Sequence, residues 1–394
     1  MSPLPLPDAD AQAHSAQLRQ LIQRQIFAAG GAIAFSQFME LALYAPGWGY
    51  YSAGASKFGA SGDFVTAPEL GPLFAACVAD AVAPVLRQIG AQAQFVELGG
   101  GSGAFAEVAL KRLLSIDALP DRYCILEPSA DLRERQQLRL RERLSPLVFE
   151  LVEWIERPLE MPWQGVLFAN EVVDALPTPR FAMRGGEVYE EYVALDGEGR
   201  FRVEDRPADA LTNAAVRHLE RYLSRDFPDG YRSEVLPQLP YWLQAVMGGL
   251  DRGAMLFVDY GYPRAEYYQP QRSDGTLRAF RRHHVVQDVL AWPGLQDITA
   301  SVDFTALAEA GTHAGFEFAG YCTQADFLIG NGLEQRLGEA DARAKDETAR
   351  MRFRNEVKRL TLPGEMGERF QAMGFARGVD FATAFLAGDL SYRL

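Results

Sequence analysis

The sequence predicts an α/β protein in which a parallel, doubly wound sheet carries an N-terminal helical region and a large α+β insertion. Three observations lead to this prediction. Short apolar runs alternate with helical patterns from Gln94 onward, as in parallel sheets with crossover helices. A glycine-rich turn follows the first run, at the edge where such sheets bind ligands. About 85 residues separate the fourth run from the fifth, far more than one crossover needs.

The individual elements follow from hydrophobic periodicity and from glycine and proline breaks. Before the sheet, helical patterns cover 11–43, with a break at Gly30-Gly31, and 73–89. The alternating part predicts strands at 95–98, 123–127, 148–152, 165–169 and 255–260, with helices at 104–114 and 131–144. The remaining predictions are an antiparallel meander over 181–203, helices at 208–223, 239–250 and 304–315, a strand at 316–321 and a charged, solvated helix at 339–354.

This order of elements predicts three parts. Residues 1–75 form an N-terminal helical region with a glycine-rich loop. Residues 76–178 and 251–394 form the sheet domain, and residues 179–250 form an inserted lobe for the substrate.

Composition and charge exclude several classes of function. The 394 residues carry 52 acidic and 39 basic side chains, so the net charge is −13. A field of that sign repels phosphate backbones and anionic lipid, which counts against nucleic acid as the partner and favours a basic polypeptide. Only three cysteines occur, with no Cys-x-x-Cys pair, so we expect free thiols and no metal site.

Targeting signals lead to an expected location. The first ten residues lack a basic stretch and an apolar core, and they contain Asp8 and Asp10, unlike a secretory or mitochondrial leader. No apolar run approaches the ~20 residues that span a bilayer. We therefore expect a cytoplasmic protein without membrane insertion, either monomeric or homodimeric.

The glycine turn Glu97-Leu-Gly99-Gly-Gly101-Ser-Gly103 predicts a nucleotide-like cofactor. The spacing fits both a dinucleotide fingerprint and an S-adenosylmethionine one, so glycines alone do not decide. A carboxylate at Glu97 would repel a pyrophosphate but suits a ligand with an ammonium and a sulfonium. Glu127 ends the second strand, where an acid accepts the ribose hydroxyls of either cofactor. The turn favours S-adenosylmethionine, and an NAD-dependent dehydrogenase remains the alternative.

The fourth strand leads directly into Asn170-Glu171-Val-Val-Asp174. At this edge of the sheet, Asn170 could orient a nucleophile, while Glu171 and Asp174 could bind a cationic acceptor or remove its proton. The same residues also fit a helix N-cap with acids on the first turn, which needs no chemistry. On the residues alone the two interpretations are evenly matched.

Several strings in the same order resemble one known family. They are Gly49-Tyr-Tyr51, Gly62-Asp-Phe-Val-Thr-Ala-Pro-Glu69, Val96 to Gly103, Asn170 to Pro177, Asp259-Tyr-Gly261, Gly275-Thr-Leu277, Asp297-Ile-Thr299 and Glu365-Met-Gly-Glu368. The chain resembles, from about residue 40 onward, the methyltransferases that include the mitochondrial complex I assembly arginine methyltransferase and its bacterial relatives. Ser301 departs from the pattern, since many relatives carry a histidine there.

The resemblance implies a seven-stranded, Rossmann-like class I methyltransferase core, S-adenosylmethionine as the cofactor and a protein substrate methylated on arginine. In the mitochondrial branch that substrate is a respiratory-complex subunit. The loop 62–69 would close over the cofactor, with Thr66, Pro68 and Glu69 as contacts. Glu190 and Glu191 on the inserted hairpin are further candidate acids. An assembly factor that binds the cofactor and docks a partner without turnover is the alternative function.

Overall fold

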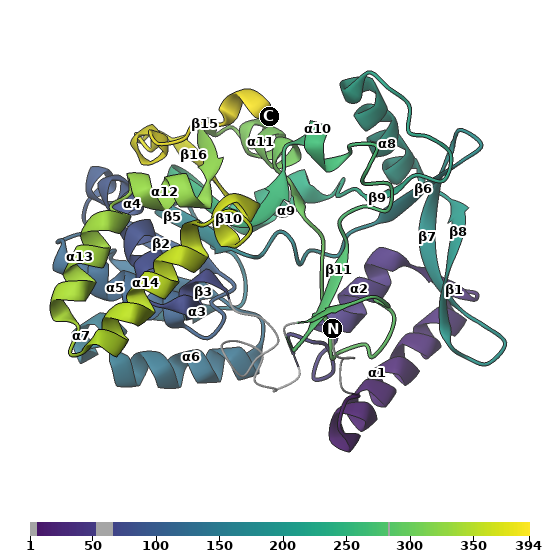
Figure 1. Cartoon of the computed structure of the whole chain (residues 1–394), viewed down its shortest axis with the longest axis horizontal. Coiled ribbons are helices and arrows are strands. Elements are labelled where there is room, and N and C mark those ends of the chain that lie inside the picture. Colours follow the sequence, from purple (N-terminus) through teal and green to yellow (C-terminus); the bar gives the residue numbers. More distant parts are fainter. Residues whose placement is uncertain (1–5, 53–65, 283) are drawn as a thin grey trace. The chain divides into compact units, whose positions relative to one another are not determined.

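The computed structural model describes residues 6–52, 66–282 and 284–394. The chain divides into two compact units (Figure 1). The first unit comprises Met1–Phe64, Asp174–Gln238 and Arg264–Ser301, and the second comprises Val65–Val173, Leu239–Pro263 and Val302–Leu394. Residues 264–301, which the sequence-based division placed in the sheet domain, thus belong to the same unit as the insertion.

The second unit is built on one mixed sheet. Its strands follow the order β15 (Glu317–Thr323), β16 (Phe370–Arg377), β10 (Leu250–Tyr262), β5 (Trp163–Asn170), β2 (Gln94–Leu98), β3 (Arg122–Leu126) and β4 (Val152–Ile155), and the short β14 (Val302–Asp303) pairs with β10. The strands from β10 to β4 are parallel, whereas β16 runs antiparallel to both β10 and β15. The predicted α/β character is confirmed.

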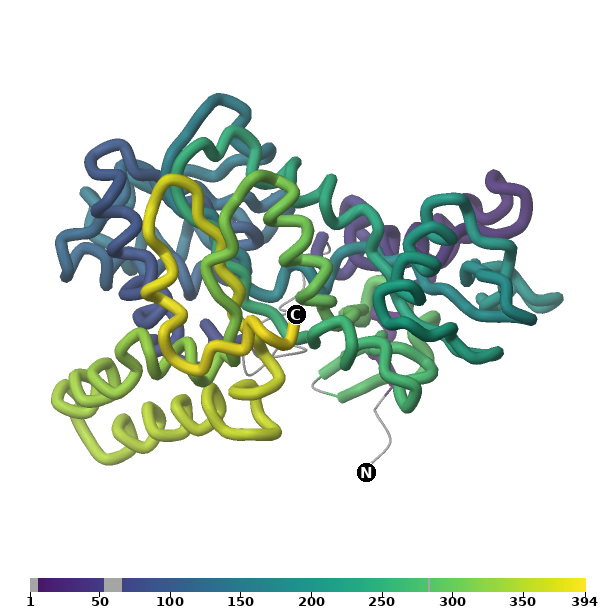
Figure 2. Tube along the Cα trace, turned by 90° about the horizontal axis from the view of Figure 1, so that it is seen from above, coloured from purple at the N-terminus to yellow at the C-terminus, as the bar shows by residue number. Residues whose placement is uncertain are grey.

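Helices connect these strands and supply most of the core. They are α3 (Ala67–Leu70), α4 (Leu73–Ile89), α5 (Ala104–Ser115), α6 (Ala130–Arg143), α7 (Pro146–Phe149), α9 (Leu239–Met247), α11 (Phe304–His313), α12 (Gln324–Gly330), α13 (Leu333–Arg343), α14 (Glu347–Thr361) and α15 (Met366–Arg369). The alanine-rich α4 is buried along almost its whole length, so it packs on all sides rather than on one face. In Figure 2, α13 and α14 lie side by side as an antiparallel pair.

Two predictions for this unit need correction, and one strand was not predicted. The expected strand at 148–152 is wrong, because Ser145 is extended and Pro146 begins the helical turn α7, so that the strand β4 starts only at Val152. The charged segment predicted as one helix forms two, α13 and α14. Its second half restarts because Asp346 caps α14 by accepting a hydrogen bond from the Ala349 amide. The strand β16 had no counterpart among the predicted elements.

The first unit combines helices with two small sheets. Its elements are α1 (Ala9–Ala28), β1 (Ala32–Ala34), α2 (Phe35–Tyr44), β6 (Arg180–Arg184), β7 (Glu187–Leu195), β8 (Phe201–Pro207), α8 (Ala210–Leu223), β9 (Arg232–Glu234), α10 (Arg264–Tyr267), β11 (Arg278–Arg281), β12 (His284–Val286) and β13 (Asp297–Thr299). The meander β6-β7-β8 is antiparallel, as the alternation predicts, and its first turn uses the left-handed conformation of Gly185 and Gly186. The predicted break at Gly30-Gly31 and the return to helix at Phe35 are confirmed by α1 and α2, and between them the chain forms β1, which pairs with β7.

The cysteines and the apolar segments bear on two expectations from composition. Cys77, Cys124 and Cys322 are buried free thiols, as expected from their number and spacing. Within the described ranges, no helix is both long enough and apolar enough to span a bilayer.

Candidate functional site

The glycine turn between β2 and α5 brings the backbone close to the end of the sheet. Gly99, Gly101 and Gly103 have φ angles of +66°, +52° and +80°, a left-handed conformation that disfavours a side chain. A Cβ on Gly100 would lie 2.7 Å from Ile125 Cγ2. The turn is therefore shaped by backbone conformation and close packing. Two of its amides are used within the protein, since Gly99 donates to the Leu126 carbonyl at 3.0 Å and Gly103 to the Gly100 carbonyl at 2.8 Å.

Glu97 lies in β2 just before this turn and is only 3% exposed. The Tyr123 hydroxyl, from the neighbouring strand β3, donates a hydrogen bond to Glu97 Oε2 at 2.7 Å. Burial raises the pKa of the Glu97 carboxyl to about 7, the hydrogen bond from Tyr123 opposes this rise, and the charge of Glu127 adds to it. Glu97 is thus a buried carboxyl that holds its proton more tightly than an exposed glutamate does.

Glu127 follows β3 and is held by α6. Its Oε1 accepts a hydrogen bond from the Ser129 amide at 3.0 Å, and its Oε2 accepts one from Gln136 Nε2 at 3.2 Å. Gln136 is completely buried, and the same nitrogen donates to the Gly101 carbonyl at 2.9 Å. The Trp154 indole completes the arrangement by donating to Gln136 Oε1 at 2.8 Å. The sequence-based reasoning missed Gln136.

A signal for Gln136 was present in the sequence. It occupies the buried stripe of α6 between Leu132 and Leu140, each four residues away, where an apolar side chain is expected. A lone amide on such a stripe indicates a buried polar role, because an uncompensated amide in a core is costly.

The described part of the predicted lid loop also contacts the turn. Ser102 Oγ donates a short hydrogen bond to Glu69 Oε1, so the helix α3 touches the glycine turn. Thr66 is the N-cap residue of α3, and Pro68 lies in its first turn. The rest of the predicted lid, 62–65, lies outside the described residues.

A second buried carboxylate lies at the start of α4. Glu356, from α14, accepts a hydrogen bond from the Leu73 amide at 2.6 Å and is 3% exposed. Burial raises its pKa to about 7, and hydrogen bonds from the Leu73 and Phe74 amides oppose the rise. A Cβ on Gly71 would lie 2.0 Å from Glu356 Oε2, so a side chain there would displace this carboxylate. Glu356 therefore caps the helix that follows α3.

The loop after β5 is strained at its first residue, Glu171. Asn170 ends β5, and its side-chain nitrogen donates to Glu171 Oε1 at 3.1 Å. Asn170 Oδ1 is buried and has no hydrogen-bond partner among the described residues. Glu171 has a φ of +53°, and its amide donates to the Val258 carbonyl at 2.9 Å. A left-handed residue other than glycine costs roughly 1–2 kcal/mol, and such strain is often found at functional sites.

Asp259 fixes the course of this loop within the second unit. It lies inside β10, is 1% exposed, and accepts hydrogen bonds from the Val173 amide at 3.0 Å and the Tyr260 amide at 2.9 Å. Its carboxylate thus positions the backbone of this loop.

Asp174 belongs to the first unit, where it lies in a cluster of tyrosines and acids. The Tyr51 hydroxyl donates to Asp297 Oδ1 at 2.8 Å, and the Tyr44 hydroxyl donates to the Ala175 carbonyl at 2.8 Å. The rings of Tyr44 and Tyr51 stack with centroids 5.5 Å apart. Burial, followed by the charge of Asp297 and then by Tyr44 and Asp174, raises the pKa of Tyr51 well above its ordinary value.

This cluster contains residues from three of the strings quoted above. Tyr51 follows Gly49, Asp174 comes from the string 170–177, and Asp297 begins the string 297–299. The negative charge and the stacked rings suit a cationic, planar group.

The two hairpin acids have different surroundings. Glu191 is 1% exposed and forms ion pairs with both Arg180 and Arg232. Both carboxylate oxygens are therefore occupied within a buried ionic network. Glu190 accepts a long hydrogen bond, 3.4 Å, from Thr212 Oγ1, and burial raises its pKa, followed by the charge of Asp209.

Comparison with solved structures gives close matches over the whole chain. A crystal structure of a protein from Burkholderia thailandensis bound to S-adenosyl-homocysteine is 40% identical, with a TM-score of 0.92 and complete coverage of both chains. A native crystal structure from the same organism is 39% identical, with a TM-score of 0.89 and the same coverage.

Curated relatives are more distant in sequence. The mitochondrial protein arginine methyltransferase NDUFAF7 homologue of Drosophila melanogaster is 28% identical, over 95% of this chain and 88% of that protein. The human protein of that name is 26% identical, over 86% of this chain and 79% of that protein.

A family model also matches this chain. It covers residues 77–322, from α4 through the glycine turn and the loop after β5 into β15. The chain belongs to this family of S-adenosyl-L-methionine-dependent methyltransferases.

Proposed function

We propose that this methyltransferase acts on an arginine side chain of a protein. The observation that carries the proposal is the cluster of Tyr44, Tyr51, Asp174 and Asp297, in which acids and stacked rings lie together. The names of the mitochondrial relatives support arginine as the acceptor.

The residues around the glycine turn fit the cofactor of the family. We propose that the Gly99, Gly101 and Gly103 backbone approaches its methionine part, that Glu97 attracts the ammonium group, and that Glu127 accepts the ribose hydroxyls. Thr66, Pro68 and Glu69 are proposed to contact the same ligand. When bound, S-adenosylmethionine supplies an electrophilic methyl group on a sulfonium.

The residues that follow β5 supply the chemistry at the acceptor in our proposal. A guanidinium is protonated at neutral pH, so carboxylates must hold it and take up a proton as transfer proceeds. Asn170 Oδ1, buried and without a partner among the described residues, is suited to accept an N–H of the acceptor. Methylation of the acceptor nitrogen would break the methyl–sulfur bond of the donor and leave S-adenosyl-homocysteine, and the carboxylate of Glu171 or Asp174 would receive the N–H proton that the nitrogen loses.

We propose further that the sheet of the second unit is that of a seven-stranded class I methyltransferase. In this scheme residues 1–75 form the N-terminal region, 76–178 with the rest of 251–394 outside 264–301 form the core, and 179–250 form the inserted substrate lobe. The segment 264–301, which joins the same unit as the insertion, contributes Asp297 to the acceptor side. A cytoplasmic location and a monomeric or homodimeric state remain predictions, and the curated relatives quoted above are mitochondrial by name.

The decisive experiment is methyl transfer from labelled S-adenosylmethionine to a set of basic proteins and arginine-containing peptides, with the modified atom located by mass spectrometry. Methylarginine supports the proposal, whereas methyl groups found only on other side chains or on small molecules contradict it. Binding of S-adenosyl-homocysteine without any transfer would favour the alternative, a partner-docking assembly factor. Stabilisation of the protein by NAD and not by S-adenosyl-homocysteine would contradict the proposed cofactor. A ligand at a hundred times its Kd adds roughly 2.7 kcal/mol to the free energy of unfolding.

A further inference from the structure

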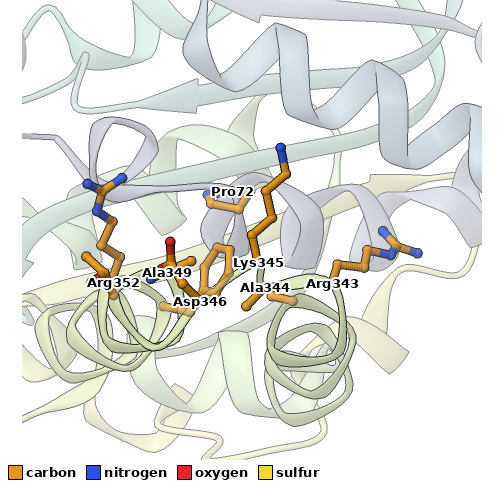
Figure 3. Close-up of a pocket in the computed structure, with 10 residues that line it drawn as sticks. Pro72, Arg343, Ala344, Lys345, Asp346, Ala349 and Arg352 are labelled. Carbon is orange, nitrogen blue, oxygen red and sulfur yellow. Dashed lines mark hydrogen bonds between the residues drawn. The ribbon is translucent and has the colours of Figure 1, made fainter.

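The second unit carries a hollow that the proposed methyl transfer does not use. Its volume is about 450 Å³, and Figure 3 shows the side chains around it. It is formed where α13 ends and α14 begins, against the residue that precedes α4, and it is lined by Pro72, Ala340, Arg343, Ala344, Lys345, Asp346, Thr348, Ala349, Arg352 and Phe353.

Three cations line this hollow. Arg343, Lys345 and Arg352 are exposed, and Figure 3 shows Lys345 between the two arginines. None of the three forms an ion pair with another described residue. By contrast, Arg350 and Arg354 on α14 form ion pairs with Glu347, and Arg354 also lies 3.7 Å from Asp341. Lys358 and Arg359, further along α14, also form no ion pair with a described residue, so what distinguishes Arg343, Lys345 and Arg352 is that they line the hollow together.

The acid among the lining residues has a structural task. Asp346 caps α14, and its Oδ1 accepts the Ala349 amide at 2.7 Å. The lining therefore combines three positive charges with one carboxylate that is already hydrogen-bonded. This local excess of positive charge occurs in a chain whose net charge is −13.

The rest of the lining is largely apolar. Pro72, Phe353 and the three alanines give the hollow an apolar wall beside its charges. Its volume lies in the range of small-molecule sites, roughly 300–1,000 Å³. A long polyanion such as nucleic acid would meet the acidic remainder of the chain, whereas a small anion feels mainly the charges within a Debye length of ~8 Å.

We propose that this hollow binds a small organic anion with at least two negative charges on an apolar or aromatic body. Nucleoside phosphates and aryl phosphates belong to this class. Binding pairs the anionic groups with Arg343, Lys345 and Arg352 and places the body against Phe353 and Pro72.

The test uses the full-length protein saturated with S-adenosyl-homocysteine, so that the methyl-donor site is not open to the probe. Guanosine diphosphate and phenyl phosphate are titrated by calorimetry at low salt. Removing the three charges together in Arg343→Gln, Lys345→Gln, Arg352→Gln should weaken binding of both at least tenfold. The matched control, Arg350→Gln, Arg354→Gln, Lys358→Gln, removes three charges from α14 outside the hollow and should change affinity less than threefold.

Several results would overturn the proposal. They are the absence of binding of both probes to the unaltered protein, an equal loss in the control variant, and an undiminished affinity in the hollow variant. Guanosine and pyrophosphate separate the two parts of the ligand. Both should bind more weakly than guanosine diphosphate, and equal affinity for pyrophosphate would contradict the role of the apolar wall. Unchanged melting temperatures establish that both variants are folded.

Discussion

The side-chain amide of Gln136 donates a hydrogen bond to the carboxylate of Glu127 at 3.2 Å. The same nitrogen also reaches the carbonyl of Gly101, so one buried amide fixes both the glycine turn and the acid proposed to hold the ribose. Helix α6 therefore sets the distance between two parts of the proposed cofactor site, although neither part lies on it.

Replacing Gln136 by leucine should weaken cofactor binding without a change of shape. The variant removes the hydrogen bonds of Gln136 to the Glu127 carboxylate, the Gly101 carbonyl and the Trp154 indole, and the one to a charged group contributes about 1.5–3 kcal/mol. We expect the affinity for S-adenosyl-homocysteine to fall at least about tenfold, measured by calorimetry. Gln137→Leu, at an exposed position of the same helix, is the control. Equal affinities of the two variants would contradict this role of Gln136.

The raised pKa of Glu97 predicts a pH dependence of stability. Because the folded protein binds this proton more tightly than the unfolded chain, the contribution is present below pH 4.5 and is lost as pH rises toward about 7. Urea unfolding of the ligand-free protein should show the unaltered chain losing stability relative to Glu97→Gln across that window. Glu356 titrates in both proteins and cancels in the difference.

The control for this measurement is Glu160→Gln, which removes an exposed carboxylate. It should follow the unaltered protein at every pH. Parallel stability curves for Glu97→Gln and the unaltered protein would show that Glu97 is not the titrating group.

Glu171 should be needed for methyl transfer although its backbone conformation lowers the stability of the fold. Glycine adopts its left-handed backbone without strain, so Glu171→Gly should preserve the free energy of unfolding or raise it by up to about 1 kcal/mol. Loss of the carboxylate should lower methyl transfer at least about a hundredfold. Ser224→Gly relieves a similar φ, +51°, at the end of α8 and should leave transfer unchanged. Full activity of Glu171→Gly would remove Glu171 from the proposed mechanism.

Asp297 should contribute to the use of the methyl acceptor and not to the binding of the cofactor. Asp297→Asn removes a charge from the cluster with Tyr51 while keeping an oxygen for its hydroxyl. We expect kcat/KM for an arginine peptide to fall about tenfold or more, with the affinity for S-adenosyl-homocysteine within twofold. Asp288→Asn, at an exposed loop position, is the control. If Asp297→Asn lowered only the affinity for S-adenosyl-homocysteine, Asp297 would belong to the cofactor site, which contradicts the proposal.

Sequence reasoning was most successful where local signals agree. The bounds of α4, 73–89, follow from periodicity and from Gly90, which ends the helix. The glycine turn between β2 and α5 lies where the Glu97–Gly103 string predicts it. The short run 148–152 shows the limit, because a few apolar residues fit a strand or a helical turn equally well, and Pro146 decided in favour of the turn.

The remaining features depend on contacts that are distant in sequence. Glu356 caps α4 from 283 residues away, and Gln136 meets Gly101 across 35 residues. Periodicity gives no distances between elements, so neither pairing was predictable. The tyrosine and acid cluster was present as separate strings, and only the fold brings Tyr51 to Asp297, 246 residues further along the chain.

The antiparallel strand β16 is also the last strand of the chain to be made, and it occupies a place between β10 and β15. A ribosome that has released β10 must still synthesise α11 to α15 before the partner of that strand emerges. Throughout that interval β10 presents an open edge, which invites pairing with other chains. During synthesis the protein is therefore prone to aggregate until Phe370–Arg377 has been made. A chain truncated before Phe370 should be insoluble when it is expressed.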